Sequence, residues 1–207
     1  MREGLLIVIS GPSGTGKSTI CQALLECFPH MGFSVSATTR PPRPGEREGE
    51  HYFFLSEEEF QRRLVQGKFL EWACVYGNYY GTLRSVVEDM LAAGQDVLFD
   101  IDIQGGRQVR AQIPNGVFIF LVPPSCAEQR RRLAARNTDC AETIEQRIRE
   151  TCLQMEALPE YDYWVINDNL EQTVATVQAI ITAEKQRVDR QKEADLVKIM
   201  RLEVDDL

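Results

Sequence analysis

Residues 5–18 read LLIVISGPSGTGKS, and this stretch decides the fold. The apolar run at residues 5–10 has the length and continuous apolarity of a strand buried on both faces of a parallel sheet. The segment after it matches the pattern G-x-x-x-x-G-K-[ST], and a helical pattern continues over residues 18–27. A strand, a glycine-rich loop and a helix in this order are the context that a phosphate-binding P-loop requires.

The P-loop predicts a site for a nucleotide phosphate chain. Its backbone N–H groups turn inward, and the N-terminal end of the helix presents positive partial charge to the same anion. Lys17 should reach the β- and γ-phosphates, and the Ser18 hydroxyl should coordinate Mg²⁺. The motif alone is compatible with a GTPase, an ATPase motor, a shikimate-type kinase or a nucleotide kinase. The loop residues expected to bind the nucleotide are Gly11, Pro12, Ser13, Gly14, Thr15, Gly16, Lys17, Ser18 and Thr19.

Further along the chain, strand-length apolar runs alternate with helical patterns. The runs are at residues 96–101, 117–122 and 163–167. The helical patterns are at residues 104–112, 125–135, 141–158 and 171–188. This alternation predicts an α/β fold, the P-loop three-layer arrangement with a parallel core sheet. We expect the core to comprise residues 1–34, 82–135 and 142–190.

Residues 35–81 break this alternation and predict an inserted lobe of mixed α/β structure. Pro41, Pro42 and Pro44 crowd a basic loop, and aromatic residues recur through the rest of the segment. Within it, Ser56 and Glu59 form a capping-box pattern that predicts a helix over residues 57–66. Residues 191–207 are highly charged with few apolar positions, and we expect a solvated helix or tail without a catalytic role.

Composition restricts the possible partners. The 207 residues carry a formal net charge of -8, which argues against a nucleic-acid partner because such proteins normally present a basic surface. The apolar run at residues 5–10 is too short for a membrane span or a signal sequence. Six separated cysteines without a C-x-x-C pair are typical of reduced thiols. We therefore expect a cytoplasmic globular protein with no membrane partner, either a monomer or a homo-oligomer.

Two arginines in the proline-rich loop suggest a second anion site. Proline restricts the backbone between Arg40 and Arg43, so their guanidinium groups are partly preorganised. Together with the hydroxyls of Tyr52 and Tyr80 they suit a terminal phosphate monoester. The alternative is a solvated basic loop, since charge clusters usually lie on the surface.

Four segments that follow the P-loop in the sequence resemble those of one known family. They are SVSATTRPPRPGE at residues 34–46, HYFF at 51–54, FLEWACVYGNYYGT at 69–82 and LFDIDIQG at 98–105. In this order and spacing, the chain closely resembles guanylate kinase from about residue 5 to residue 185. The resemblance implies transfer of the γ-phosphoryl group of ATP to GMP, and also to dGMP, with Mg²⁺ as the cofactor.

The resemblance also implies roles for individual residues. Ser36, Glu71 and Thr82 would read the guanine base, because a hydroxyl and a carboxylate complement its carbonyl, ring N–H and amine and leave adenine mismatched. Glu46 would order the arginine loop. Asp100 would hold the Mg²⁺ water shell, and Asp102 would lie at or near the guanine. For both aspartates, the alternative is a strand-end residue that satisfies turn amides.

A basic cluster at residues 130–136 resembles the start of the lid of this family. The resemblance implies a helical lid at residues 136–141 that closes over ATP, with Asn167 and Asp168 beside the adenine. Arginines there would neutralise charge on the transferred phosphoryl group. The implied catalytic residues are Lys17, Arg132, Arg136 and Arg147.

Other readings remain open. A guanylate-kinase-like binding module without catalysis usually has a degraded P-loop, whereas Gly16, Lys17 and Ser18 are present here. A related P-loop kinase with a phosphorylated sugar as acceptor is the third reading, and the guanine set argues against it. We expect His30 and His51, like Arg130 and Arg131, at the surface, and Trp72 and Trp164 in the core.

Overall fold

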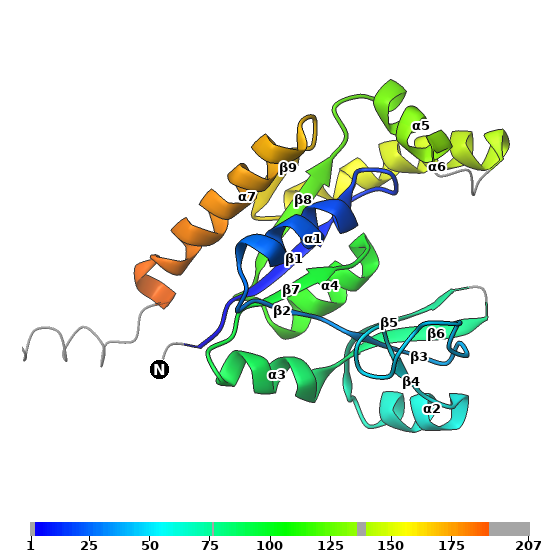
Figure 1. Cartoon of the computed structure of the whole chain (residues 1–207), viewed down its shortest axis with the longest axis vertical. Coiled ribbons are helices and arrows are strands. Elements are labelled where there is room, and N and C mark those ends of the chain that lie inside the picture. Colours follow the sequence, from blue (N-terminus) through cyan, green and yellow to red (C-terminus); the bar gives the residue numbers. More distant parts are fainter. Residues whose placement is uncertain (1–2, 76, 136–139, 191–207) are drawn as a thin grey trace, which may run out of the picture.

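The computed structural model describes residues 3–75, 77–135 and 140–190. Its centre is a five-stranded sheet in which every described pairing is parallel, with the P-loop strand β1 in the middle (Figure 1). This confirms the predicted α/β class. In spatial order the strands are β2 (Gly32–Phe33), β7 (Val97–Asp100), β1 (Leu6–Ser10), β8 (Val117–Val122) and β9 (Tyr163–Ile166).

Helices cover both faces of the core sheet, which is why the central strands are apolar without alternation. On one face, Ile7 and Ile9 pack with residues of α1 (Lys17–Cys27) and α7 (Leu170–Lys185). On the other face, Leu6 and Val8 pack with residues of α3 (Arg84–Ala92) and α4 (Ile103–Gln112). The three layers place the carboxyl ends of β1 and β7 side by side, because Ile9 pairs with Asp100.

A second sheet with its own helix forms the inserted lobe. Its spatial order is β4 (Phe53–Phe54), β3 (Ser36–Thr38), β6 (Asn78–Leu83) and β5 (Phe69–Val75). The β3–β4 pairing is parallel, and the β3–β6 and β5–β6 pairings are antiparallel. Helix α2 (Glu57–Val65) places Phe60 against Phe69, with ring centroids 4.3 Å apart. The lobe therefore has a small apolar core of its own.

The N-terminus of α2 forms one half of the predicted capping box. The Ser56 hydroxyl accepts a hydrogen bond of 3.1 Å from the backbone N–H of Glu59. The Glu59 carboxylate instead binds Arg63 at 2.5 Å and also pairs with Arg62. These two arginines lower the pKa of Glu59.

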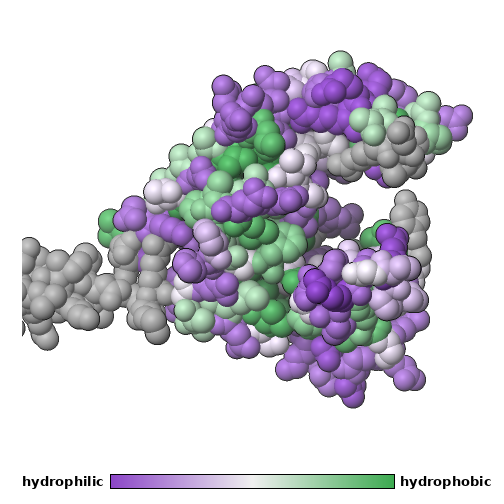
Figure 2. All heavy atoms as spheres, viewed as in Figure 1, coloured by the Kyte–Doolittle hydropathy of each residue, from purple (hydrophilic) through white to green (hydrophobic). Residues whose placement is uncertain are grey.

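Two helices, α5 (Cys126–Ala135) and α6 (Ala141–Gln154), pack together through Leu133, Ile144 and Ile148. Figure 2 shows the molecule hollowed between these helices and the inserted lobe. After α6 the chain continues as the 3-10 helix η1 (Met155–Glu160), so the helix expected over residues 141–158 ends as an α-helix at Gln154. Residues 136–139 of the expected lid lie outside the described part of the chain.

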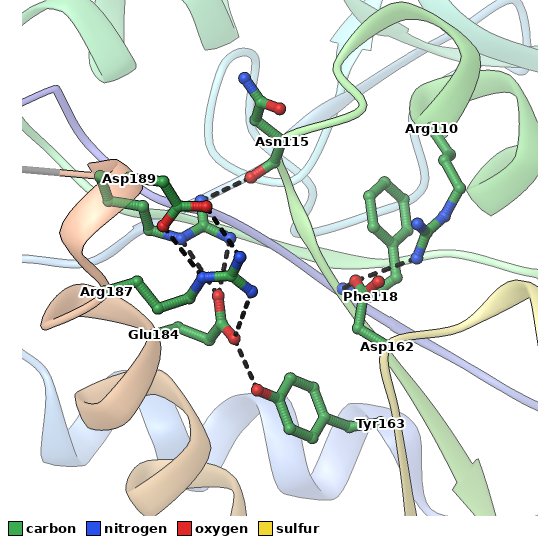
Figure 3. A network of polar contacts seen from close by, with 9 residues as sticks. Arg110, Asn115, Phe118, Asp162, Tyr163, Glu184, Arg187 and Asp189 are labelled. Carbon is green, nitrogen blue, oxygen red and sulfur yellow. Dashed lines mark hydrogen bonds and ion pairs between the residues drawn. The ribbon is translucent and has the colours of Figure 1, made fainter.

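A polar network links the end of α7 and the 3-10 helix η2 (Val188–Arg190) to the core sheet at the amino ends of its strands (Figure 3). Glu184 at its centre is only 3% exposed. Its carboxylate accepts hydrogen bonds from the Tyr163 hydroxyl at 2.5 Å and from Arg190 at 2.7 Å. Arg190 also donates to the carbonyl of Asn115 at 2.5 Å. The last described helix is therefore held at the amino ends of β8 and β9. Residues 191–207, the expected charged tail, lie outside the described residues.

The expectation of buried tryptophans was wrong. Trp164 is 57% exposed and Trp72 is 38% exposed. Trp164 lies on β9, an edge strand of the core sheet. The side chain of Val165 packs against α7, so Trp164 and Ile166 on either side of it point to the opposite face. Trp72 lies on β5, an edge strand of the lobe, where its ring centroid is 6.1 Å from that of Tyr79. Edge strands have less cover than central ones.

The predicted surface residues lie where expected. His30 and His51 are exposed, and His51 Nδ1 accepts a hydrogen bond of 3.1 Å from the Arg47 backbone. All six cysteines are free, and only Cys21 is buried. No helix of the described residues is long and apolar enough to cross a membrane.

Candidate active site

The P-loop wraps tightly because its glycines adopt backbone angles that other residues avoid. Gly16 has a φ of 90° at the start of α1. At Gly11, whose φ is 145°, a Cβ atom would lie 2.2 Å from the Leu121 carbonyl oxygen of β8. Any larger residue there would displace the loop from the sheet. Lys17 Nζ donates to the loop carbonyls of Gly11 at 2.7 Å and Pro12 at 3.2 Å, so the ammonium lies inside the loop.

Two side chains from other parts of the chain hold the outside of the loop. Asn167, just after β9, donates to the Thr15 carbonyl at 2.7 Å and is 6% exposed. Gln129 on α5 donates to the Ser13 carbonyl at 2.8 Å. Sequence reasoning missed Gln129, because it lies within a charged helical run and only the tertiary contact distinguishes it.

Ser18 and Asp100, the two residues expected near a metal ion, are in direct contact. The Ser18 hydroxyl donates to Asp100 Oδ2 at 2.7 Å. The bond joins the first turn of α1 to the carboxyl end of β7, where parallel α/β sheets bind their ligands. Both donors are hard oxygen atoms of the kind that Mg²⁺ prefers.

Asp102 caps the N-terminus of α4. Its Oδ1 atom accepts a hydrogen bond of 2.8 Å from the Gly105 backbone N–H. This is the turn-satisfying role that the sequence left open for it, and its side chain is also exposed toward solvent. A cavity of about 510 Å³ lies beside Asp102, with Arg107, Gln154 and Glu160 among its lining residues.

A buried carboxylate stands in the inserted lobe. Glu71 is 8% exposed, and its Oε1 atom accepts a hydrogen bond of 2.7 Å from the Thr82 hydroxyl. A Cβ atom on Gly105 would lie 3.3 Å from Glu71 Oε2, so the first turn of α4 meets this carboxylate. Burial raises the pKa of Glu71, and the charge of Asp102 adds to the increase.

The strands of the lobe align the other expected base-binding residues. Ser36 on β3 pairs with Thr82 on β6, and Glu71 on β5 pairs with the same Thr82. Ser34, just before β3, is 8% exposed, with its hydroxyl 3.3 Å from that of Thr82. Three neighbouring strands thus bring hydroxyl groups and one carboxylate together. Sequence reasoning did not single out Ser34.

The arginine loop is held by Glu46. Arg40 donates to both carboxylate oxygens of Glu46, at 2.8 and 3.0 Å, and the Arg43 backbone N–H donates at 2.7 Å. Arg40 lowers the pKa of Glu46, and Glu46 in turn raises the pKa of Arg40. The Tyr52 and Tyr80 rings meet edge to face at 6.0 Å, and Arg40 lies 5.3 Å from the Tyr52 ring centre. The loop therefore has defined order, and the Arg43 side chain is exposed.

The expected catalytic arginines occupy different places. Arg132 on α5 binds Glu128 at 2.7 Å and lies 3.5 Å from the carbonyl oxygens of Thr15 and Asp168. Arg147 is half-buried on α6. Arg136 lies outside the described residues. The neighbouring Arg130 and Arg131 are exposed and pair with the surface carboxylates of Glu145 and Glu128, which confirms the expectation that they are solvated.

Comparison with known proteins identifies the family. The guanylate kinase family model matches residues 3–184. The guanylate kinase of Symbiobacterium thermophilum is 53% identical over 188 residues, covering 91% of this chain and 89% of that protein. The guanylate kinase of Desulfitobacterium hafniense is 50% identical, covering 91% and 94%. A crystal structure of guanylate kinase from Anaplasma phagocytophilum superimposes with a TM-score of 0.75 at 32% identity, covering 98% of this chain and 97% of that one. The chain belongs to the guanylate kinase family.

Proposed function

We propose that this protein transfers the γ-phosphoryl group of ATP to GMP or dGMP, giving ADP and GDP or dGDP. The observation that carries the proposal is the buried Glu71 carboxylate, hydrogen-bonded by Thr82 and facing the first turn of α4. No cation among the described residues pairs with Glu71, and a buried carboxylate without such a partner is costly. A ligand with hydrogen-bond donors is therefore the expected complement. The P-loop, as the expected binding site for the phosphates of ATP, supports the other part of the proposal, the phosphoryl donor.

Guanine recognition follows from the donor and acceptor pattern. Glu71 accepts from the ring N–H and the exocyclic amine of guanine, and the Ser36 hydroxyl donates to its carbonyl oxygen. Thr82 lies beside the base and gives its hydrogen to Glu71, which holds the carboxylate in place. Asp102, at the N-terminus of α4, accepts from the amine or positions the base. Adenine presents a ring acceptor and an amine in place of the carbonyl, so it leaves these buried groups unpaired and is rejected.

The phosphate of GMP binds to the arginine loop. Arg40 and Arg43 offer their guanidinium groups, and Tyr52 and Tyr80 offer hydroxyls. Glu46 keeps Arg40 and the backbone of Arg43 in place, as its three hydrogen bonds indicate. This places the acceptor phosphate at the end of a stiff loop.

ATP binds through the P-loop, residues 11–18, with Thr19 in the first turn of α1 and with Asn167 and Asp168 beside the adenine. In the transfer, an oxygen of the GMP phosphate forms a bond to the γ-phosphorus while the bond from that phosphorus to the β-phosphate bridging oxygen breaks. Lys17, Arg132, Arg136 and Arg147 neutralise the charge on the transferring group. The attacking oxygen carries no proton, so the reaction needs no general base.

Mg²⁺ fits the oxygen donors at the P-loop. Ser18 would bind the ion and Asp100 would hold its water shell, and the ion would neutralise phosphate charge. No group of three or more His, Cys, Asp or Glu residues that could hold a metal occurs in the described part of the chain. This agrees with an ion that keeps several waters and is held mainly by the phosphates of the substrate.

A coupled assay tests the proposal by comparing GMP, AMP, UMP and CMP as acceptors with Mg-ATP. We expect GMP to be phosphorylated far faster than the other three, EDTA to abolish the reaction and added Mg²⁺ to restore it. Absence of turnover with GMP would point to the binding-module reading. Equal turnover of GMP and AMP would contradict the role given to Glu71.

A further inference from the structure

One face of α5 contacts three successive residues of the P-loop. Gln129 donates to the Ser13 carbonyl at 2.8 Å, and Arg132 lies 3.5 Å from the Thr15 carbonyl. Between them, a Cβ atom on Gly14 would lie 2.8 Å from Leu133, so the helix and the loop are in close contact there. Positions 129, 132 and 133 share a face because they are three and four residues apart.

The side chain of Gln129 is 0% exposed, and both hydrogens of its amide are used. One is donated to the Ser13 carbonyl at 2.8 Å and the other to the Thr151 hydroxyl oxygen at 2.7 Å. A carbonyl oxygen can only accept, so the nitrogen of this amide must face Ser13. The contact itself fixes the orientation of the amide.

The chain of hydrogen bonds continues into α6. Because the Thr151 hydroxyl accepts from Gln129, its single hydrogen is available elsewhere, and it is donated to the carbonyl of Arg147 at 2.9 Å. Thr151 is 5% exposed. A buried path with fixed donors and acceptors therefore runs from the P-loop, through Gln129 and Thr151, to the turn of α6 that carries Arg147.

Stability alone does not explain this polar path. Gln129 Oε1 is buried and finds no hydrogen-bond donor among the described residues, which is unfavourable for folding. On the same faces of α5 and α6, Leu133, Ile144 and Ile148 form an apolar cluster. A leucine at position 129 would suit this interface without the unpaired oxygen. Polar groups kept at such a cost are expected where function requires them.

We propose that Gln129 is a positioning residue, which together with Thr151 holds the turn of α6 carrying Arg147 in a fixed position relative to the P-loop. The inference rests on the proposed function, in which the P-loop holds the phosphates of ATP and Arg147 neutralises the transferring group. A small displacement between such groups strongly slows a transfer reaction. Loss of the link therefore slows the transfer step and leaves GMP binding, which uses the inserted lobe, unchanged.

The test uses Gln129→Leu, Thr151→Val and the double variant, which replaces both polar partners with apolar groups of similar size. We expect each variant to lower kcat about tenfold, with the KM for GMP within about twofold of wild type. The double variant should be no slower than the single variants, because both members of the Gln129–Thr151 pair are then apolar and only the Ser13 carbonyl loses its donor. Thr151→Ser keeps the hydroxyl and should keep the wild-type kcat.

A second measurement asks whether the link acts through Arg147. Arg147→Ala should lower kcat by a smaller factor in the Thr151→Val background than in the wild type, because the guanidinium is already misplaced. Thr182→Val is the matched control, since Thr182 makes the same bond to the carbonyl four residues before it, on α7. This control should change neither kcat nor KM.

Each unfavourable outcome has a distinct meaning. A double variant with wild-type kcat overturns the role of Gln129, and so does a fully additive effect of Arg147→Ala. A wild-type protein that fails to phosphorylate GMP in the same assay overturns the proposed function instead. If Thr151→Ser lowers kcat as much as Thr151→Val does, this result also contradicts the inference.

Discussion

The Thr82 hydroxyl donates to Glu71 Oε1 over 2.7 Å, and both side chains are almost completely buried. Thr82 has one hydrogen, so the hydroxyl of Ser34, 3.3 Å away, must be the donor in their contact. The three groups form a directed series from Ser34 to Thr82 to Glu71. The carboxylate at its end keeps further acceptor capacity for a ligand.

Glu71→Gln should reduce kcat/KM for GMP by about ten- to a hundredfold or more, because charge-assisted hydrogen bonds contribute roughly 1.5–3 kcal/mol each. The affinity for ATP should barely change. The preference for GMP over AMP should shrink, since an amide can donate to the ring nitrogen of adenine. Steady-state kinetics with both nucleotides measure this, with the exposed Glu58→Gln on α2 as the control. An unchanged GMP-to-AMP ratio in a folded Glu71→Gln protein would falsify the guanine assignment.

GMP binding should weaken as the pH is lowered. Burial raises the pKa of Glu71, so its carboxylate takes up a proton at a higher pH than an ordinary glutamate does. Only the ionised form accepts two hydrogen bonds from guanine, so protons and GMP compete as the pH falls through the raised pKa. Calorimetric titration with GMP from about pH 8 to about pH 5 measures the effect.

Glu71→Gln provides the control for this pH dependence. The GMP phosphate itself takes up a proton at about pH 6, as phosphate monoesters do. The slope that remains in the variant belongs to the phosphate, and the difference from the wild type belongs to Glu71. Identical slopes in the two proteins would show that Glu71 does not titrate against GMP.

Lys17→Met should leave the fold intact and remove most of the turnover. The ammonium of Lys17 contacts the carbonyls of Gly11 and Pro12 inside the P-loop, where it can offset charge on the transferring phosphoryl group. We expect a loss of about a hundredfold or more in kcat, of the order seen when one electrostatic group is removed. Circular dichroism checks the fold, and the exposed Lys68→Met serves as the matched variant. A near-wild-type rate in folded Lys17→Met contradicts the P-loop assignment.

Glu184→Gln should destabilise the protein without a direct effect on the active site, because the site lies at the carboxyl ends of the strands and Glu184 at their amino ends. Removing one partner from a buried ion pair costs about 3–5 kcal/mol, because Arg190 is left without its counter-charge. Urea unfolding measures the loss, and Glu171→Gln in the exposed first turn of the same helix should have little effect. A wild-type unfolding midpoint would contradict the anchoring role of the network.

The pH dependence of this stability has a defined sign. Burial raises the pKa of Glu184, but the hydrogen bonds from Tyr163 and Arg190 outweigh burial and hold the pKa below its ordinary value. The stability that Glu184 contributes is therefore present above the ordinary glutamate pKa and is lost as the pH falls through the lowered one. The wild type and Glu184→Gln should converge in stability at acidic pH.

The strands of the core could be predicted because central parallel strands need continuous apolar runs. The run at residues 117–122 has the same bounds as β8. The two-residue strand β2 is too short to show periodicity, and α3 buries only Val87, so neither element was predicted. Position in the sheet, which decided the exposure of Trp164, is likewise a long-range property.

The site was predictable where a local motif carries the chemistry and not elsewhere. The P-loop is recognised from a local sequence pattern. The contact between Ser18 and Asp100 could be expected because the carboxyl ends of neighbouring parallel strands lie together. Gln129 and Ser34 have no local signal, because each is recognisable only through a partner distant in the sequence. A local motif can point to candidate ligand-binding groups, whereas the groups that support them are found only from the fold.

The hydrogen bonds that Glu46 accepts from Arg40 and from the backbone of Arg43 affect the rate at which a substrate can bind. With three prolines in the same loop, its conformational entropy is lost when the chain folds and not when the nucleotide arrives. In the proposed function, the GMP phosphate therefore meets a loop that is already ordered, and its capture requires no further ordering of this segment. Association can then proceed at the rate set by diffusion and charge attraction, and dissociation sets the differences in affinity among nucleotides.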